Sequence, residues 1–142
     1  MDTQSLFSLE GRTALVTGGS RGIGKMIASG FIGQGAKVYI SSRKAEVCEA
    51  VAKELGPNCI AVPQDISTVE GCKALAATMA EHEDSIDVLV NNAGAAWGES
   101  FESHPEEGWD KVMNLNLNQC FFSHKLCMNC LKPALLIKSQ PR

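Results

Sequence analysis

The chain has 142 residues, 44% hydrophobic and 20% charged, a composition typical of one globular domain with a substantial core. Its formal net charge is −3, and neither acidic nor basic residues form a long block, which argues against nucleic acid and anionic membranes as partners. No apolar stretch reaches the roughly 18 to 20 residues of a membrane span and no leader pattern opens the chain, so we expect a soluble, cytoplasmic protein, with an organellar lumen as the alternative.

Two strand-and-helix units open the chain. Residues 12–17 (RTALVT) predict a buried parallel strand, and the helical pattern that follows ends at the glycines of residues 33–35. Residues 36–42 predict a second strand, and residues 44–55 a second helix that stops before Gly56. The apolar residues at helical spacing in these two helices are Ile23, Met26, Ile27, Phe31, Val47, Val51 and Leu55.

Two further units follow. Residues 59–65 predict a third strand, and residues 68–81 predict a helix. Residues 86–94 (IDVLVNNAG) predict the fourth strand, and after a looser stretch a helix begins near Trp109 and runs through Phe122, or as far as Leu131. The residues that the third helix turns inward are Cys72, Leu75 and Met79.

The alternation of strands and helices predicts an α/β fold, a doubly wound parallel sheet of the Rossmann type with about four strands and four helices over residues 1–142. Ligands of such sheets bind outside the carboxyl ends of the strands. Residues 17–24, 41–43, 65–66 and 91–94 should therefore converge on one site.

The first strand end reads TGGSRGIG. Gly18, Gly22 and Gly24 allow a tight turn and a close backbone approach just before a helix, whose free N–H groups and positive dipole end suit a pyrophosphate. A plain strand-to-helix turn uses the same glycines, so this pattern by itself leaves both interpretations open.

Basic residues at two strand ends indicate which dinucleotide is preferred. Sites that prefer NAD usually carry a carboxylate after the second strand, where this chain has Ser41, Ser42 and Arg43. A guanidinium there can bind a 2′-phosphate that a carboxylate would repel, and Arg21 is placed to join it. The pair favours NADP(H); two solvated surface charges are the alternative.

The other two strand ends carry polar groups. Asp65 can accept from the exocyclic amine of an adenine, or it can precede the next helix with Ser67 or Thr68 as the cap. The sequence NNAG at residues 91–94 joins side-chain amides to small residues that let the backbone lie close to a ribose, although asparagine and glycine also favour plain turns.

Taken in order, TGGSRGIG, SSR, DIS and NNAG resemble the short-chain dehydrogenase/reductase (SDR) family, from about Leu9 to about Phe122. Within the family the chain is most similar to NADPH-dependent 3-oxoacyl reductases of the rhamnolipid-associated type. The resemblance implies hydride transfer between NADP(H) and a small carbonyl substrate, a ketone or an acyl thioester, in an intact protein that is homo-oligomeric. A sugar, steroid or xenobiotic carbonyl stays open as the substrate.

The resemblance also implies roles for individual residues. Asn116 matches the family's catalytic-site asparagine, and we expect it to face a cleft, about 60° from a buried stripe of Met113, Leu117 and Phe121. The implied cofactor-binding residues are Gly18, Ser20, Arg21, Gly22, Ile23 and Gly24 for the phosphates, Ser42 and Arg43 for the 2′-phosphate, Asp65 and Ile66 for the adenine, and Asn92, Ala93 and Gly94 for the ribose.

The chain departs from the family in its catalytic tyrosine and lysine, which lie four positions apart on a later helix. The single tyrosine here, Tyr39, is followed four positions later by Arg43, and on a strand these positions are about 13 Å apart. Residues 131–142 read like the turn before a fifth strand. We therefore expect a C-terminally incomplete reductase that binds cofactor but lacks the catalytic serine, tyrosine and lysine. A non-catalytic isoform that binds nucleotide or a full-length partner is the alternative.

Cysteine spacing suggests neither disulfides nor a metal. Cys48, Cys59 and Cys72 fall singly within strand and helix patterns, so we expect small buried hydrophobic residues in a reducing compartment. His124, Cys127 and Cys130 have ligand-like spacing, but a structural zinc needs a fourth ligand and the segment continues an amphipathic helix. We expect no metal site.

Overall fold

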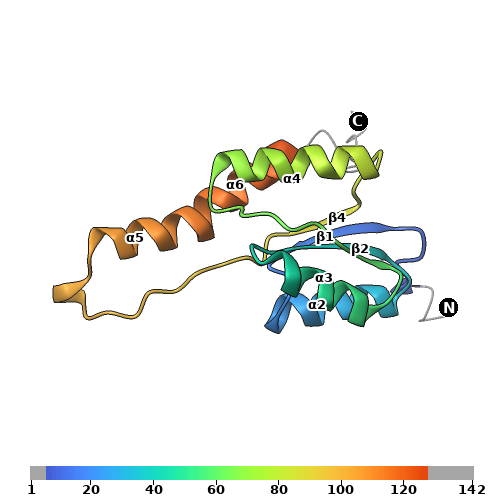
Figure 1. Cartoon of the computed structure of the whole chain (residues 1–142), viewed down its shortest axis with the longest axis horizontal. Helices are drawn as coiled ribbons and strands as arrows, with labels where there is room; N and C mark the ends of the chain where they lie inside the picture. Colours follow the sequence, from blue (N-terminus) through green and yellow to red (C-terminus); the bar gives the residue numbers. More distant parts are fainter. Residues whose placement is uncertain (1–5, 128–142) are drawn as a thin grey trace, which may run out of the picture.

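Four parallel strands form the centre of the structure, a computed structural model that describes residues 6–127 (Figure 1). The strand order is β3-β2-β1-β4, so β1 lies between β2 and β4, with Leu15 opposite Tyr39 on one side and Leu89 on the other. The apolar residues of β1 are completely buried, which explains why its sequence is an uninterrupted apolar run. The strands are β1 (Thr13–Thr17), β2 (Lys37–Ser41), β3 (Cys59–Ala61) and β4 (Val88–Val90).

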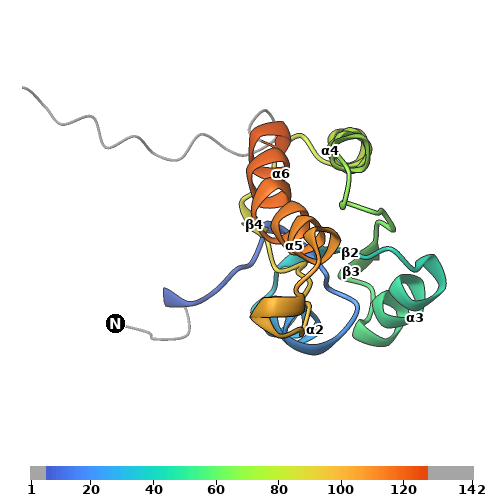
Figure 2. The same ribbon diagram turned by 90° about the vertical axis from the view of Figure 1, so that its left-hand side faces the viewer.

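Helices cover both faces of this sheet, as Figures 1 and 2 show. Two helices pack on one face and two on the other, which confirms the predicted doubly wound architecture. None of the helices in residues 6–127 is long and apolar enough to cross a membrane. The helices of the first face are α2 (Gly22–Gly33) and α3 (Ala45–Leu55), and those of the second are α4 (Val69–His82) and α6 (Gln119–Cys127).

Alternate residues of the strands supply two separate cores. Val16 and Ile40 point to the core under α2 and α3, whereas Leu15 and Tyr39 point to the core under α4 and α6. Cys48, Cys59 and Cys72 are buried in these cores, as predicted. Cys72, Leu75 and Met79 face inward from α4, as predicted.

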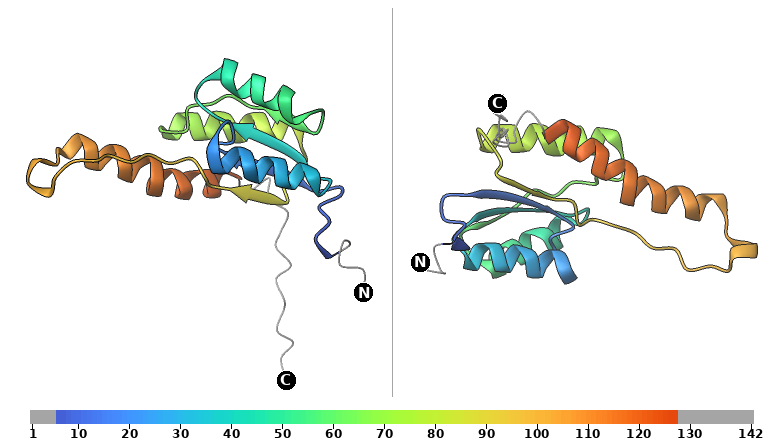
Figure 3. Two further views of the ribbon diagram at one scale, coloured as in Figure 1. Left: turned by 90° about the horizontal axis from the view of Figure 1, so that it is seen from below. Right: turned by 180° about the vertical axis from the view of Figure 1, so that it is seen from behind.

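An arm, residues 95–113, extends beyond the sheet (Figure 3). It consists of an extended strand-like segment, the short helix η1 (Phe101–Ser103) and α5 (Glu106–Met113), and it joins α6 through the π-helical η2 (Asn114–Asn118). Within the arm the Trp97 ring lies against Gly108, where an added Cβ would come within 2.9 Å of the ring. Lys111 Nζ lies 4.9 Å from the centre of the same ring, so the two sides of the arm are fastened together.

The buried faces of two helices match the predicted apolar stripes only in part. Ile27 and Phe31 of α2 and Leu55 of α3 pack against the core. Ile23 and Met26 are 71% and 72% exposed, and α2 instead buries its small residues Gly24 and Ala28. The reason is close packing, because a Cβ on Gly24 would overlap the Gly18 carbonyl oxygen and the helix lies too near the sheet for a larger side chain. Val47 at the start of α3 is also exposed, while Val51 is buried as expected.

The last helix also differs from the prediction, because its inward face is not the predicted stripe of Met113, Leu117 and Phe121. Leu117 and Phe121 are 58% and 63% exposed, and the buried positions are Gln119 and Ser123. The π-helical turn of η2 takes more residues per turn than an α-helix, so positions before and after it do not continue one α-helical stripe. This helix also begins earlier than predicted, at Glu106, directly after Pro105.

Candidate functional site

One cavity of about 690 Å³ collects the carboxyl ends of the four strands. A volume of this size is typical of a site for a small molecule or cofactor. Every cofactor-binding residue predicted from the sequence lines it, although these residues come from motifs far apart in the chain. They are Gly18, Ser20, Arg21, Gly22, Ile23, Gly24, Ser42, Arg43, Asp65, Ile66, Asn92, Ala93 and Gly94.

The glycine loop forms one wall. Gly18 and Gly22 have φ angles of +67° and +51°, which favour glycine, and nothing lies within 4 Å of the position where Gly22 would carry a Cβ. The loop leads into α2, whose N-cap residue, Arg21, makes no side-chain capping bond. The first N–H groups of α2 therefore remain available to an anion at the positive end of the helix.

A second helix N-terminus opens onto the same cavity between β2 and α3. Arg43 and Lys44 line the cavity there, and Lys44, the N-cap of α3, makes no side-chain capping bond. By contrast, α4 is capped by its own Thr68, whose Oγ1 accepts from Gly71 N at 3.0 Å. Within residues 6–127, no ion pair involves Arg21, Arg43 or Lys44. The cavity thus has an excess of unpaired positive charge.

Asp65 takes part in local structure at the edge of the cavity. Its Oδ1 accepts from Ser67 N at 2.9 Å, which forms a turn before α4, and Thr68 provides the cap. This geometry supports the alternative in which Asp65 precedes the helix. Its Oδ2 makes no hydrogen bond within residues 6–127, and recognition of an adenine by Asp65 stays a prediction.

Thr17, a residue not singled out from the sequence, fixes β4 to the glycine loop. Its Oγ1 accepts from the N–H groups of Asn92 and Ala93, both at 3.1 Å, and donates to the Val90 carbonyl at 3.2 Å. The Asn92 amide donates to the carbonyls of Thr17 and Gly18, at 3.0 and 3.3 Å. The Asn92 side chain therefore links the end of β4 to the glycine loop, and Asn92 also lines the cavity.

Asn116 lies beside the cavity and is not among its lining residues, whereas its neighbour Leu115 is. Its Oδ1 accepts from Ala95 N at 2.8 Å and its Nδ2 donates to Ala95 O at 2.9 Å. The amide thus makes a two-point contact with the backbone where the arm begins, next to Gly94. The expectation that its neighbour Leu117 is buried was wrong, and a catalytic-site role for Asn116 stays a prediction.

Tyr39 is not suited to general acid–base catalysis. Tyr39 is 1% exposed, and its hydroxyl donates to Glu83 Oε1 at 2.6 Å. Burial raises the pKa of Tyr39, and the hydrogen bond to Glu83 raises it further. Tyr39 does not line the cavity, which agrees with its rejection as a catalytic residue.

Several lining residues escaped prediction. Lys44 follows Arg43 directly, so the basic pair was visible in the sequence, whereas Leu115 reaches the cavity only through the packing of the last helix. No cluster of three metal-ligating side chains occurs in the described residues, and Cys130 and the side chains of His124 and Cys127 lie outside them. Ser41 belongs to the strand end that was expected at the site but was given no cofactor contact, and the other lining residues outside the prediction are Lys44, Val47, Gln64 and Leu115.

Comparisons with known proteins match this arrangement. The family model for short chain dehydrogenase matches residues 12–138. The chain is 48% identical over 131 residues to the rhamnolipids biosynthesis 3-oxoacyl-[acyl-carrier-protein] reductase of Pseudomonas aeruginosa, covering 91% of this chain and 50% of that protein. It is 36% identical over 115 residues to the NAD-dependent glycerol dehydrogenase of Listeria innocua, covering 81% of this chain and 45% of that one.

A solved structure shares the fold. The "Pseudomonas aeruginosa RhlG/NADP active-site complex" superposes with a TM-score of 0.85 at 47% identity, over 87% of this chain and 49% of that one. The chain therefore spans about half the length of the proteins it matches. These similar proteins include NADP-bound and NAD-dependent ones, so similarity alone does not select the dinucleotide.

Proposed function

This chain belongs to the short-chain dehydrogenase family, and from that premise we propose that residues 1–142 form the NADP(H)-binding region of an oxidoreductase that reduces a ketone or 3-oxoacyl substrate. The observation that carries the proposal is the cavity where two uncapped helix N-termini, α2 and α3, meet the unpaired cations Arg21, Arg43 and Lys44. A ligand with two separate anionic groups matches this arrangement.

The residues divide between the parts of the dinucleotide. The glycine loop and the first N–H groups of α2 would hold the pyrophosphate, because Gly22 leaves its backbone open to the cavity. Asp65 and Ile66 would lie beside the adenine, and Ala93 and Gly94 beside the ribose of the nicotinamide.

The 2′-phosphate would bind at the start of α3. Ser42 and Arg43 line the cavity there, and Lys44 adds a third basic residue to Arg21 and Arg43. A phosphate monoester carries nearly two negative charges at neutral pH, and charge-assisted bonds to guanidinium groups are among the strongest in proteins. The absence of a carboxylate at Ser41 and Ser42 supports NADP(H) over NAD(H).

The bound nicotinamide supplies or accepts the hydride. In this chain, Ala93 and Gly94 would hold the ribose of the nicotinamide, and Thr17 and Asn92 keep that segment fixed to the glycine loop. Asn116 fixes Ala95, so the start of the arm keeps its position beside the cavity. The substrate class is proposed from the Pseudomonas aeruginosa relative, whose name gives a 3-oxoacyl thioester as substrate.

Binding without turnover is what we expect of the 142 residues alone. The only tyrosine is buried, hydrogen-bonded to a carboxylate and outside the cavity, so it cannot deliver a proton to a carbonyl bound there. A non-catalytic protein that binds nucleotide is accordingly the second candidate function. An NADPH-oxidation assay with a 3-oxoacyl thioester tests the absence of turnover that both candidates expect of this chain, and turnover would contradict the assignment of the tyrosine.

Calorimetric titration tests the cofactor. The chain should bind NADPH more tightly than NADH, and Arg43→Ala should weaken NADPH about tenfold while it leaves NADH nearly unchanged, since the lost group contacts the 2′-phosphate alone. Lys53→Ala, at the far end of α3, is the matched control and should change neither affinity. Equal loss for both dinucleotides in Arg43→Ala would exclude a 2′-phosphate contact.

A further inference from the structure

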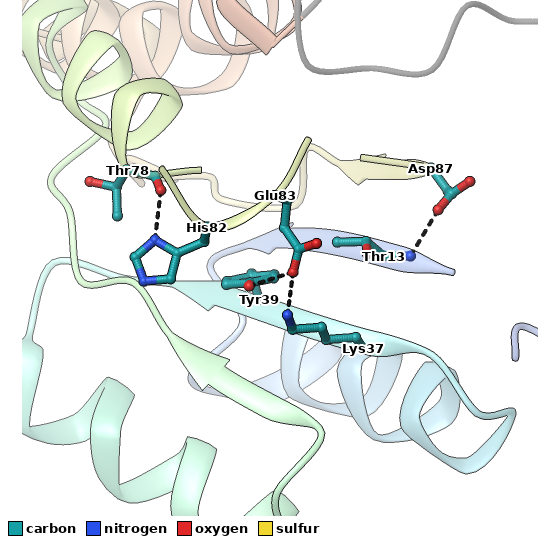
Figure 4. Close-up of polar contacts among 7 residues, drawn as sticks. All are labelled: Thr13, Lys37, Tyr39, Thr78, His82, Glu83 and Asp87. Carbon is teal, nitrogen blue, oxygen red and sulfur yellow. Dashed lines mark hydrogen bonds and ion pairs between the residues drawn. The ribbon is translucent and has the colours of Figure 1, made fainter. Parts of the chain in front are cut away.

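Away from the cavity, a carboxylate connects the end of α4 to β2 (Figure 4). Glu83 begins the connection between α4 and β4, and its Oε1 accepts from the Tyr39 hydroxyl at 2.6 Å and pairs with the Lys37 ammonium. The Glu83 side chain is 16% exposed, while Lys37 is 47% exposed. We call Glu83, Lys37 and Tyr39 the Glu83 cluster.

Three titratable groups face the Glu83 carboxylate from the elements around it. Lys37 and Tyr39 come from β2, with Lys37 Nζ 5.4 Å from the centre of the tyrosine ring. His82 comes from α4, and its ring meets the Tyr39 ring edge-on with 6.1 Å between centres. The His82 Nδ1 lies 2.8 Å from the Thr78 carbonyl, which can only accept, so this nitrogen donates.

The other end of the same connection is fastened separately. Asp87 accepts from Thr13 N and from Arg12 Nη1, both at 2.9 Å, so it binds the start of β1. Residues 83–87 are therefore attached to the sheet at both ends, because Glu83 binds β2 and Asp87 binds the start of β1 (Figure 4). Loss of one contact leaves the other in place, so the two can be tested independently.

The ionised state of Glu83 is what this geometry requires. A carboxylate accepts from two donors, whereas the neutral acid loses its attraction to the ammonium and becomes a donor itself. Burial alone would raise the pKa of Glu83, but the hydrogen bonds from Lys37 and Tyr39 hold it below its usual value. The cluster is thus closed at neutral pH.

We propose that the Glu83 cluster is a proton-operated fastener, which holds the α4–β4 connection on β2 while Glu83 is ionised and releases it when acid protonates this carboxylate. Opening frees the Tyr39 hydroxyl and the Lys37 ammonium together, because both depend on the same oxygen. The core residues of α4, Leu75 and Met79, keep the helix on the sheet, so the change is confined to the connection.

The single tyrosine provides a direct reporter. In the full chain with isotope-labelled tyrosine, the Tyr39 ring resonances should shift with a midpoint below the ordinary glutamate value of about 4.3. Glu83→Gln should abolish this transition, and Glu81→Gln, at an exposed site two residues away, should preserve it. A transition that persists in Glu83→Gln would overturn the proposal.

An alkaline titration provides the second measurement. The hydrogen bond to Glu83 raises the pKa of Tyr39 and the one to Lys37 lowers it, so the phenolate absorbance should appear at lower pH in Glu83→Gln and at higher pH in Lys37→Gln. Circular dichroism at each pH shows that the variant is folded. Shifts in the same direction for the two variants, or no shift in either, would show that the three groups do not titrate as one cluster.

Discussion

The Thr17 hydroxyl accepts hydrogen bonds from the backbone N–H groups of Asn92 and Ala93, and so joins the end of β1 to the end of β4. Thr17 itself is buried, with 1% of its surface exposed. The relationship explains how β4, which pairs with β1 through only three residue pairs, keeps its end in position. It also gives the threonine of TGGSRGIG a structural role separate from that of the glycines.

Thr17→Val should therefore destabilise the protein. It removes one acceptor and one donor, and takes away the partner of the Ala93 N–H, whereas the Asn92 N–H also donates to the Val90 carbonyl at 3.0 Å. An unsatisfied buried group costs about 1 to 3 kcal/mol, so we expect a loss of about 2 kcal/mol in urea denaturation. Thr17→Ser keeps the oxygen and should lose less than half as much. Equal losses in the two variants would assign the effect to the missing methyl group.

Ser41 should behave in the opposite way. It is 1% exposed, and its Oγ has no hydrogen-bond partner among the described residues. Ser41→Ala removes a desolvated hydroxyl without leaving a partner unpaired, so the free energy of unfolding should rise by about 1 kcal/mol. Thermal unfolding without nucleotide measures the change. A lower melting temperature in Ser41→Ala would mean that the hydroxyl makes a stabilising contact.

The pKa of Cys59 predicts how the free energy of unfolding falls at alkaline pH. Burial raises the pKa of its thiol to about 11, and the nearby Cys48 adds to the shift. The native protein therefore favours the neutral thiol, and this preference contributes to the free energy of unfolding. The contribution is complete below the ordinary thiol pKa, near 8.5, and is lost as the pH rises toward 11. Urea midpoints should decrease over this interval. In Cys59→Ala the decrease should be smaller, and an unchanged slope would show that other groups cause it.

The sequence predicted the sheet and the position of the cavity because both depend on local patterns. The apolar run of β1 and the glycine loop after it are contiguous, so residues 13–24 reveal a strand, a turn and a helix without any distant contact. Lys44 is predictable on the same grounds, because it follows Arg43 directly in the sequence.

Features that depend on contacts between distant residues could not be predicted in this way. Tyr39 and Glu83 are 44 positions apart, and neither belongs to a motif. The inward face of the last helix depends on the π-helical turn at Asn114–Asn118. The spacing of hydrophobic residues in the sequence does not predict this turn. Ile23 and Met26 have helical spacing but lie at the surface, because α2 packs through its smallest residues. A rule that places large apolar residues inward fails where close approach of the backbone matters more.

Two glycines of α2 test that explanation directly. An alanine Cβ at Gly24 would overlap the Gly18 carbonyl and come within 2.5 Å of Asn92 Nδ2, so Gly24→Ala should push the helix from the glycine loop. We expect a loss of stability above about 2 kcal/mol, the range for overpacking at a rigid site, together with weaker binding of NADPH. Circular dichroism with urea and a nucleotide titration measure the two effects.

Gly30, two turns along the same helix, is the matched control. Nothing lies within 4 Å of its missing Cβ, and its φ is not positive, so an alanine fits without strain. Gly30→Ala should raise the free energy of unfolding by about 0.5 to 1 kcal/mol, because alanine loses less backbone entropy in a helix, and nucleotide binding should stay unchanged. If Gly24→Ala were as well tolerated as Gly30→Ala, close packing could not explain why α2 exposes Ile23 and Met26. The phosphate-binding role of the loop would then need another structural basis.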